Sequence, residues 1–158
     1  MPRIHEGGLR ADGKRFAIIA SRFNDFMVEK LTQGALDALR RSGAKDDDIE
    51  IFRCPGAFEI PALLQKVADT GRFQGVVCLG VVIRGGTAHF DLVVGEATSG
   101  AARIAAAGKV AVGFGVLACE NIEQAVERAG SKGGNRGYDA AMVAIEMANL
   151  FADASLNR

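Results

Sequence analysis

The sequence predicts a three-layer α/β sandwich built on a flavodoxin-like, four-stranded and mainly parallel sheet. Strand-like and helix-like patterns alternate from Phe16 onward, which is typical of parallel strands joined by helices. The segment Gly75–Ile83 is apolar throughout, as expected for a central strand that helices cover on both faces. Right-handed crossovers then favour the flavodoxin-like arrangement of the strands.

The first predicted strand and helix follow from the spacing of apolar residues. The run Phe16–Ala20 is short, apolar and followed by polar residues, which indicates a buried strand. Apolar residues then recur at helical spacing. Asn24 or Asp25 is expected to cap the start of this helix, and Gly43 to end it.

The second predicted strand and helix lie on either side of a turn. Residues Ile49–Arg53 alternate between apolar and polar, as in a half-exposed edge strand. Pro55 and Gly56 then turn the chain into a helix around residues 60–68, which Gly71 closes.

The second half of the chain continues the alternation. The predicted segments are a small-residue helix at 90–107, a strand at 110–117, a short helix at 123–129, a flexible glycine-rich loop at 130–134 and a helix at 136–154. No internal repeat or linker interrupts them, so residues 1–158 are predicted to form one domain. Residues 1–15 lack a helical pattern, and we expect them to form an N-terminal arm or strand that pairs with another chain.

The charge balance argues against polyanionic partners. The chain has 19 basic and 19 acidic residues, and the basic residues do not cluster, so neither nucleic acid nor a membrane surface is expected as a partner. The N-terminus lacks the apolar core of a signal peptide, and no apolar run approaches the ~20 residues of a membrane helix. We therefore expect a cytoplasmic protein.

The cysteines indicate a reduced protein without a metal site. Cys54, Cys78 and Cys119 are far apart in the sequence and lack Cys-x-x-Cys spacing. Only His5 and His89 could join them as ligands, so zinc is not expected.

Unusual residue sets follow three of the predicted strands. They are Ser21–Asn24, Cys54–Glu59 and Ile83–Asp91. Ligands of open α/β sheets bind beyond the carboxyl ends of the strands, so an exposed aromatic, a carboxylate and a histidine should meet in one crevice. These observations predict a site without naming its substrate.

The same segments carry a family resemblance that spans nearly the whole chain. Blocks similar to motifs of the 6,7-dimethyl-8-ribityllumazine synthase family occur in the family order. They are Arg22-Phe23-Asn24-Asp25, Pro55-Gly56-Ala57-Phe58-Glu59-Ile60-Pro61, Gly80 to Phe90, Glu123 to Gly130, Lys132-Gly133-Gly134-Asn135-Arg136-Gly137 and Ala144 to Leu150.

The resemblance implies a condensation of 5-amino-6-ribitylamino-uracil with 3,4-dihydroxy-2-butanone 4-phosphate. The amine forms an imine with the ketone, phosphate is eliminated, and the ring closes with loss of water. No cofactor is expected, because each step moves protons and none needs a metal or a redox group. Two alternatives stay open: a flavin- or lumazine-binding module without catalysis, and a structural shell protein.

Two residues resemble the catalytic pair of the family. His89 matches the proton-transfer residue, a role suited to a side chain that titrates near neutral pH. Asp139 matches the acidic partner of that histidine. Taken alone, the two residues could instead be a solvent-facing histidine and an ordinary carboxylate in the first turn of a helix.

Most of the other matched residues resemble a binding site for the pyrimidine and its ribityl chain. Phe23 matches the aromatic that stacks on the ring, and Phe114 an aromatic placed across a subunit contact, although each could instead be a core residue. The set expected to bind this substrate is Phe23, Ala57, Phe58, Glu59, Val81, Val82, Ile83, Phe114 and Arg136, with Val82 and Ile83 acting through their backbones.

The expected phosphate site combines backbone amides with an arginine. Gly86 and Thr87 lie in a turn whose N–H groups could form an anion nest at a helix start. Arg128 matches the family arginine that pairs with phosphate, a geometry that suits a guanidinium. On composition alone, Arg128 would be a solvated charge. Arg84 is a weaker candidate, because an ion pair at the strand end would also explain it.

A few positions depart from the family pattern. Arg136 stands where lysine is frequent, Val81 where a small or polar residue is frequent, and Cys54 where valine is usual, while Ala118-Cys119 replaces a threonine pair. These departures bear on substrate affinity more than on the reaction, because no matched catalytic group is missing.

The resemblance also implies a homo-oligomer. It places Phe114, Arg128 and Asp139 across a subunit contact from Phe23 and Glu59, with His89 among the groups beside Arg128, in a ring of five subunits. A shell of twelve pentamers with 60 subunits and an association with riboflavin synthase are further expectations. The small residues Ala97, Gly100, Ala101 and Ala105 fit packing around a five-fold axis or, alternatively, an ordinary tight contact within the chain.

Overall fold

The computed structural model describes residues 1–131 and 134–157 and has a parallel four-stranded sheet at its centre. The strands lie in the order β2-β1-β3-β4, which is the order of flavodoxin-like sheets. Their bounds are Phe16–Ser21 for β1, Ile49–Cys54 for β2, Gly75–Ile83 for β3 and Ala111–Cys119 for β4. The predicted central strand is β3, and the predicted edge strand is β2, so the fold class is confirmed.

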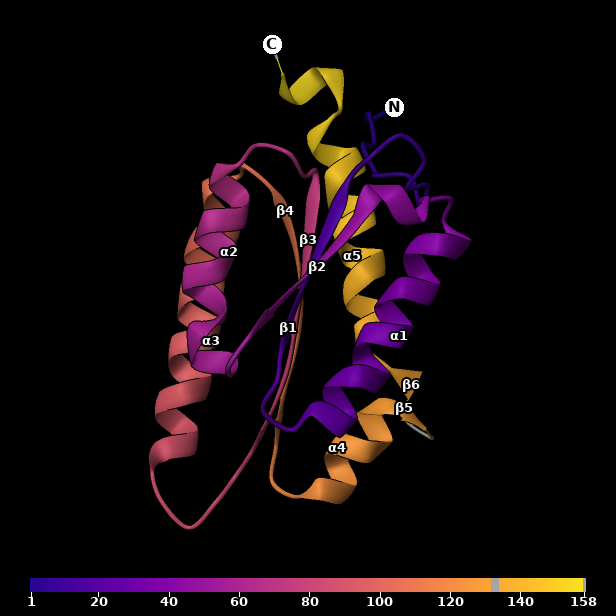
Figure 1. Cartoon of the computed structure of the whole chain (residues 1–158). Helices are drawn as coiled ribbons and strands as arrows, with labels where there is room; N and C mark the ends of the chain where they lie inside the picture. Colours follow the sequence, from indigo (N-terminus) through magenta and orange to yellow (C-terminus); the bar gives the residue numbers. More distant parts are fainter. Residues whose placement is uncertain (132–133, 158) are drawn as a thin grey trace.

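Helices cover both faces of the sheet, as Figure 1 shows. On one face lie α1 (Asp25–Arg41), α4 (Ile122–Arg128) and α5 (Arg136–Phe151), and on the other α2 (Ile60–Asp69) and α3 (His89–Ala107). Three short 3-10 helices complete the helical segments among the described residues: η1 (Asp46–Asp48), η2 (Ala57–Glu59) and η3 (Ala154–Leu156). No described helix combines the length and the apolar character needed to cross a membrane.

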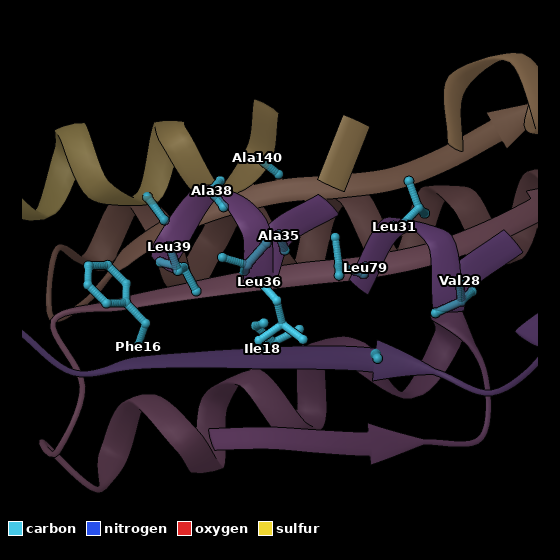
Figure 2. Packing of buried hydrophobic residues seen from close by; sticks show 14 of the residues in the cluster. Phe16, Ile18, Val28, Leu31, Ala35, Leu36, Ala38, Leu39, Leu79 and Ala140 are labelled. Atoms are coloured by element: carbon cyan, nitrogen blue, oxygen red, sulfur yellow. The ribbon is translucent and has the colours of Figure 1, made fainter. Parts of the chain in front are cut away.

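The larger core lies between the sheet and the layer formed by α1 and α5. Figure 2 shows Phe16 and Ile18 of β1 pointing towards Leu36 and Leu39 of α1. These four side chains are between 0 % and 9 % exposed. Burying a side chain of this size contributes about 1.5–3 kcal/mol, so this core fixes α1 against the sheet.

The second core lies between the sheet and the layer formed by α2 and α3. Here the small residues of α3 pack within the chain: Ala97, Gly100 and Ala101 are buried, and a side chain at Gly100 would overlap Pro61 of α2. The ordinary tight contact therefore explains these three positions, and five-fold packing is not needed for them.

Two sequence expectations near the C-terminus are wrong in detail. Most of the loop expected at 130–134 belongs to a small antiparallel hairpin of β5 (Ala129–Ser131) and β6 (Gly134–Asn135), while residues 132–133 lie outside the described residues. The last helix ends at Phe151 and not at residue 154. Its continuation is broken because the Asp153 carboxylate accepts the Ser155 N–H and begins a separate turn.

The N-terminal arm lies beside the C-terminal end of α5. The Asn149 side chain donates hydrogen bonds to the carbonyls of Gly8 and Arg10 at 2.6 and 2.8 Å, and His5 pairs with Asp153 at 2.9 Å. The hydrogen bond from His5, and next those from the side chain and the amide of Ser155, lower the pKa of the Asp153 carboxyl to about 2. The ends of the chain are close together in Figure 1 for this reason.

Close approach of α1 and α5 depends on Gly137, where a Cβ atom would overlap the Leu31 carbonyl. We expect Gly137→Ala to lower the free energy of unfolding by about 1–3 kcal/mol, because backbone on both sides must move. Gly95→Ala in α3 is the matched control, since nothing lies within 4 Å of its added atom. The control should gain about 0.5–1 kcal/mol. Urea unfolding followed by circular dichroism measures both, and equal stabilities would contradict the packing described for Gly137.

Candidate functional site

A cleft of about 660 Å³ lies at the carboxyl ends of β1, β2 and β3. Three segments that are far apart in the sequence build it: the β1–α1 connection, the β2–α2 connection, and the end of β3 with the start of α3. The predicted site residues that line it are Phe23, Ala57, Phe58, Glu59, Val81, Val82, Ile83, Thr87 and His89. The parallel order of the strands brings these segments to one edge of the sheet.

The β1–α1 connection presents Phe23 to the cleft. The backbone N–H groups of Arg22 and Phe23 donate to the carbonyls of Cys54 and Pro55 at 2.8 and 3.0 Å. The ring of Phe23 nevertheless remains 73 % exposed. Its flat apolar surface is therefore available to a ligand, and the alternative of a core phenylalanine is wrong.

Asn24 occupies the N-cap position of α1, one of the two positions that the sequence predicted, but it does not cap the helix through its side chain. Its side chain makes no cap hydrogen bond, and its backbone is in the left-handed region, with φ of 61°. The side-chain Nδ2 instead donates to the carbonyl of Val81 on β3 at 2.8 Å. The side chain thus links the two strand ends that flank the cleft.

The β2–α2 connection forms a second wall from the short helix η2. Ala57 is buried, while Phe58 is exposed and Glu59 half-buried at the cleft. Cys54 lies beneath this wall and donates through its thiol to the Gly56 carbonyl at 3.5 Å. The wall therefore offers an apolar ring and a hydrogen-bond-accepting carboxylate side by side.

The end of β3 directs backbone groups towards the cleft. β1 pairs with β3 only as far as Ala20 and Leu79, whereas β4 pairs with it up to Ile83. The Arg84 N–H donates to Cys119 on the β4 side at 2.9 Å. Because backbone groups of successive residues point to opposite sides of a strand, those of Ile83 point away from β4 and towards the cleft.

His89 is the first residue of α3 and stands at the cleft with an exposed side chain. Its backbone N–H donates to the Thr87 hydroxyl at 3.3 Å. Gly86 lies in the loop just before, between lining residues Gly85 and Thr87. Neither Gly85 nor Gly86 has a φ in the left-handed region, so the alternating backbone of an anion nest is absent from these two positions. Amide donors here come from the helix start itself.

Arg84 forms the ion pairs that the sequence offered as its alternative role. Its guanidinium lies 2.8 Å from Glu120 and 3.5 Å from Asp91, and it stacks 4.4 Å from the centre of the Phe90 ring. These partners hold the charge on the strand end and away from an incoming anion.

The cysteines near the cleft are protonated thiols at neutral pH. Burial, and next the negative charge of Glu59, raise the pKa of Cys54 to about 11. Burial, with a smaller effect of Cys54, raises the pKa of Cys78 to about 12. Neither side chain is a thiolate nucleophile, so the chemistry of the cleft belongs to other groups.

Apart from Gly86, which lies between two lining residues, four predicted site residues lie away from the cleft. Phe114 is on the edge strand β4 and is 41 % exposed, although its neighbours Val112 and Val116 on the same face pack against the second core. The other three lie in the helix layer of α1, α4 and α5, on the face of the sheet opposite to α2 and α3. Arg128 ends α4, with its Nη1 atom donating to the Gln124 carbonyl, and Arg136 and Asp139 lie 3.7 Å apart at the start of α5.

The cleft lacks a cation of its own. Neither arginine nor lysine is among the residues that line it, as far as the structure describes the chain. Arg84, which follows β3, is occupied by two carboxylates. A phosphate-bearing ligand in this cleft would need positive charge from elsewhere.

Comparison with known proteins assigns the family. The model of the family described as 6,7-dimethyl-8-ribityllumazine synthase matches residues 13–152. The chain belongs to the 6,7-dimethyl-8-ribityllumazine synthase family. Members of this name from Chlorobium phaeobacteroides, Desulfatibacillum aliphaticivorans and Desulfotalea psychrophila are 56 %, 55 % and 56 % identical to it. The aligned parts cover 92 %, 95 % and 95 % of this chain and 94 %, 97 % and 97 % of those proteins.

The lumazine synthase match includes the lining of the cleft and the four residues outside it. The sequence placed Asn24 in a segment of the expected crevice without giving it a role, and it missed the lining residues Leu92 and Val93. Leu92 and Val93 follow His89 by three and four residues, so the helical period would have placed them beside it. Nothing in the local sequence indicated the bond from Asn24 to Val81.

Proposed function

We propose that this chain condenses 5-amino-6-(D-ribitylamino)uracil with 3,4-dihydroxy-2-butanone 4-phosphate to give 6,7-dimethyl-8-ribityllumazine, phosphate and water. The observation that carries the proposal is the family match over residues 13–152, which includes every predicted residue of the cleft. This activity is the penultimate step of riboflavin biosynthesis. Absorbance of the lumazine product, followed after mixing the two substrates with purified chain, tests it. Binding of the product without turnover would contradict it and favour a binding module.

The pyrimidine is proposed to lie against Phe23, with its polar edge at the end of β3. The exposed ring supplies a stacking surface, and the Ile83 backbone points into the same space. Phe58 and Ala57 flank the ribityl chain, and the Glu59 carboxylate accepts hydrogen bonds from its hydroxyls. Val81 and Val82 line the cleft between these groups.

His89 is proposed to move the protons of the reaction. The amine loses a proton as it forms the imine, a carbon acid loses one as phosphate leaves, and water departs as the ring closes. An exposed imidazole at the mouth of the cleft can accept and return each proton in turn. Each of these steps is a proton transfer, an addition or an elimination, so the reaction calls for neither a metal nor a redox cofactor.

The missing cation leads us to propose that a neighbouring subunit completes the site. Its Arg128 would pair with the phosphate beside Thr87 and the start of α3, while its Phe114 would cover the pyrimidine. Its Arg136 and Asp139 would lie near the ribityl chain and His89. The exposed apolar ring of Phe114 on an edge strand supports a subunit contact at this face.

The proposed assembly is a pentamer, with twelve pentamers forming a 60-subunit shell in the cytoplasm that associates with riboflavin synthase. Light scattering on purified chain tests the oligomer: particles of at least five subunits are expected at neutral pH. A monomer that keeps its activity on dilution would contradict the shared site. Isolated pentamers would contradict only the shell, and co-sedimentation tests the association with riboflavin synthase.

The variant His89→Ala is expected to lower kcat by roughly 100- to 10,000-fold, because one group serves several proton transfers. Some turnover should persist, since bringing the two substrates together accelerates imine formation by itself. Steady-state kinetics with both substrates at saturation measure the effect. His5→Ala is the matched control, since His5 lies at the N-terminal arm. An unchanged kcat in the His89 variant would remove this role.

The variant Arg128→Ala is expected to raise KM for the butanone phosphate far more than KM for the pyrimidine, because only the former carries a dianion. A lost charge-assisted contact of about 1.5–3 kcal/mol corresponds to a rise of about 10- to 150-fold. Arg41→Ala, which removes an exposed helix arginine paired with Asp37, serves as the control. Equal effects on the two Michaelis constants would make Arg128 a structural residue.

A further inference from the structure

We propose that Asn24 is a positioning residue that locks the Phe23-bearing loop to the end of β3 and thereby sets the affinity for the pyrimidine. The inference rests on the proposed function, because it assigns a role within that same cleft. It is carried by one long-range hydrogen bond, by an unusual backbone conformation and by the different lengths of two neighbouring strands.

The bond from Asn24 takes the place of a backbone hydrogen bond that β1 cannot make, because β1 ends before β3 does. The last pair between β1 and β3 is Ala20 with Leu79, yet β3 continues beside β4 to Ile83. The carbonyl of Val81 therefore lies past the end of β1, in a residue that is only 2 % exposed. Buried carbonyls need a hydrogen-bond donor. The Nδ2 atom of Asn24 donates to it at 2.8 Å, where the next ladder bond would otherwise be.

The backbone at Asn24 restricts which residue can supply that donor. Among the described residues it is the sole non-glycine position with a positive φ, at 61°. Asparagine and aspartate tolerate this conformation better than other side chains, and glycine accepts it freely. Aspartate has the shape of asparagine but only acceptor oxygens when ionised, and glycine has no side chain. Asparagine alone among the three meets both demands.

The bond decides how Phe23 stands relative to β3. Two backbone bonds, from Arg22 and Phe23 to the carbonyls of Cys54 and Pro55, attach the loop to the β2 side of the cleft. The hydrogen bond from the Asn24 side chain to Val81 attaches the loop to β3. The exposed Phe23 ring has little packing of its own to hold it. Without Asn24, the stacking surface and the backbone groups of β3 would no longer be held at a fixed distance.

Two variants separate the donor from the backbone requirement. Asn24→Asp keeps the shape and the left-handed preference, and Asn24→Gly keeps only the backbone freedom, while both remove the donor. Both are expected to raise KM for the pyrimidine by roughly tenfold, the size of one lost hydrogen bond to a buried group. The values of kcat and of KM for the butanone phosphate should stay within about twofold of the original chain. A role in folding alone would not produce this split.

The matched control is Asn157→Asp, which also removes an Nδ2 donor to backbone carbonyls, those of Phe151 and Asp153, but lies at the C-terminal end of the chain. Its kinetics should equal those of the original chain. Unchanged pyrimidine KM in both Asn24 variants, or equal losses for both substrates, would overturn the inference. If the original chain shows no turnover, the proposed function fails instead. Hydrogen exchange of the backbone amides of residues 22–26 then tests whether Asn24 holds the loop to β3. Faster exchange in both variants supports this role, and unchanged exchange contradicts it.

Discussion

Strand β3 runs past the end of β1, and the cleft exists because of this difference in length. Beyond Leu79, the β1 side of β3 is open, and a ligand can reach the backbone of Ile83 there. The rest of the site is arranged around this opening: Asn24 closes its inner end at Val81, and Phe23 and Glu59 form its walls. His89 follows at the start of α3, after the loop that leaves the end of β3. The two buried cores hold the strands in the register on which the opening depends.

The cleft that results holds only some of the groups that the two substrates need. It offers an aromatic surface, a carboxylate, backbone groups and an imidazole, but the described lining provides no cation for a phosphate. Arg128, Arg136 and Asp139 gather on the opposite helix layer, and Phe114 stays partly exposed on the edge strand β4. Both sets of residues belong to the matched family region. A ring in which the second set of one subunit faces the cleft of the next would join them without any change in the fold.

Much of the fold could be predicted because its signals are local or periodic. The uninterrupted apolar run of β3 marks a central strand, and the alternation in β2 marks an edge. The three cleft segments were predicted because each directly follows a strand, and parallel strands end at one edge. The bond from Asn24 to Val81 was not predictable, since it joins positions 57 residues apart and depends on where β1 stops. The hairpin of β5 and β6 was not predicted because its strands are only three and two residues long. The end of α5 at Phe151 was not predicted because it depends on a single side-chain hydrogen bond, that of Asp153 with the Ser155 amide.

The central claim is that each complete site takes its cleft from one subunit and its arginine from the next. A mixture of two variant subunits tests this claim most directly. The His89→Ala subunit keeps Arg128, and the Arg128→Ala subunit keeps the cleft with His89. After the two variants are unfolded together and reassembled in equal amounts, about one quarter of the contacts should join two intact halves, as expected for random head-to-tail rings. Activity should then rise well above that of either variant reassembled alone. Activity that equals the average of the two separate variants would contradict a shared site and would place all catalytic groups within one subunit.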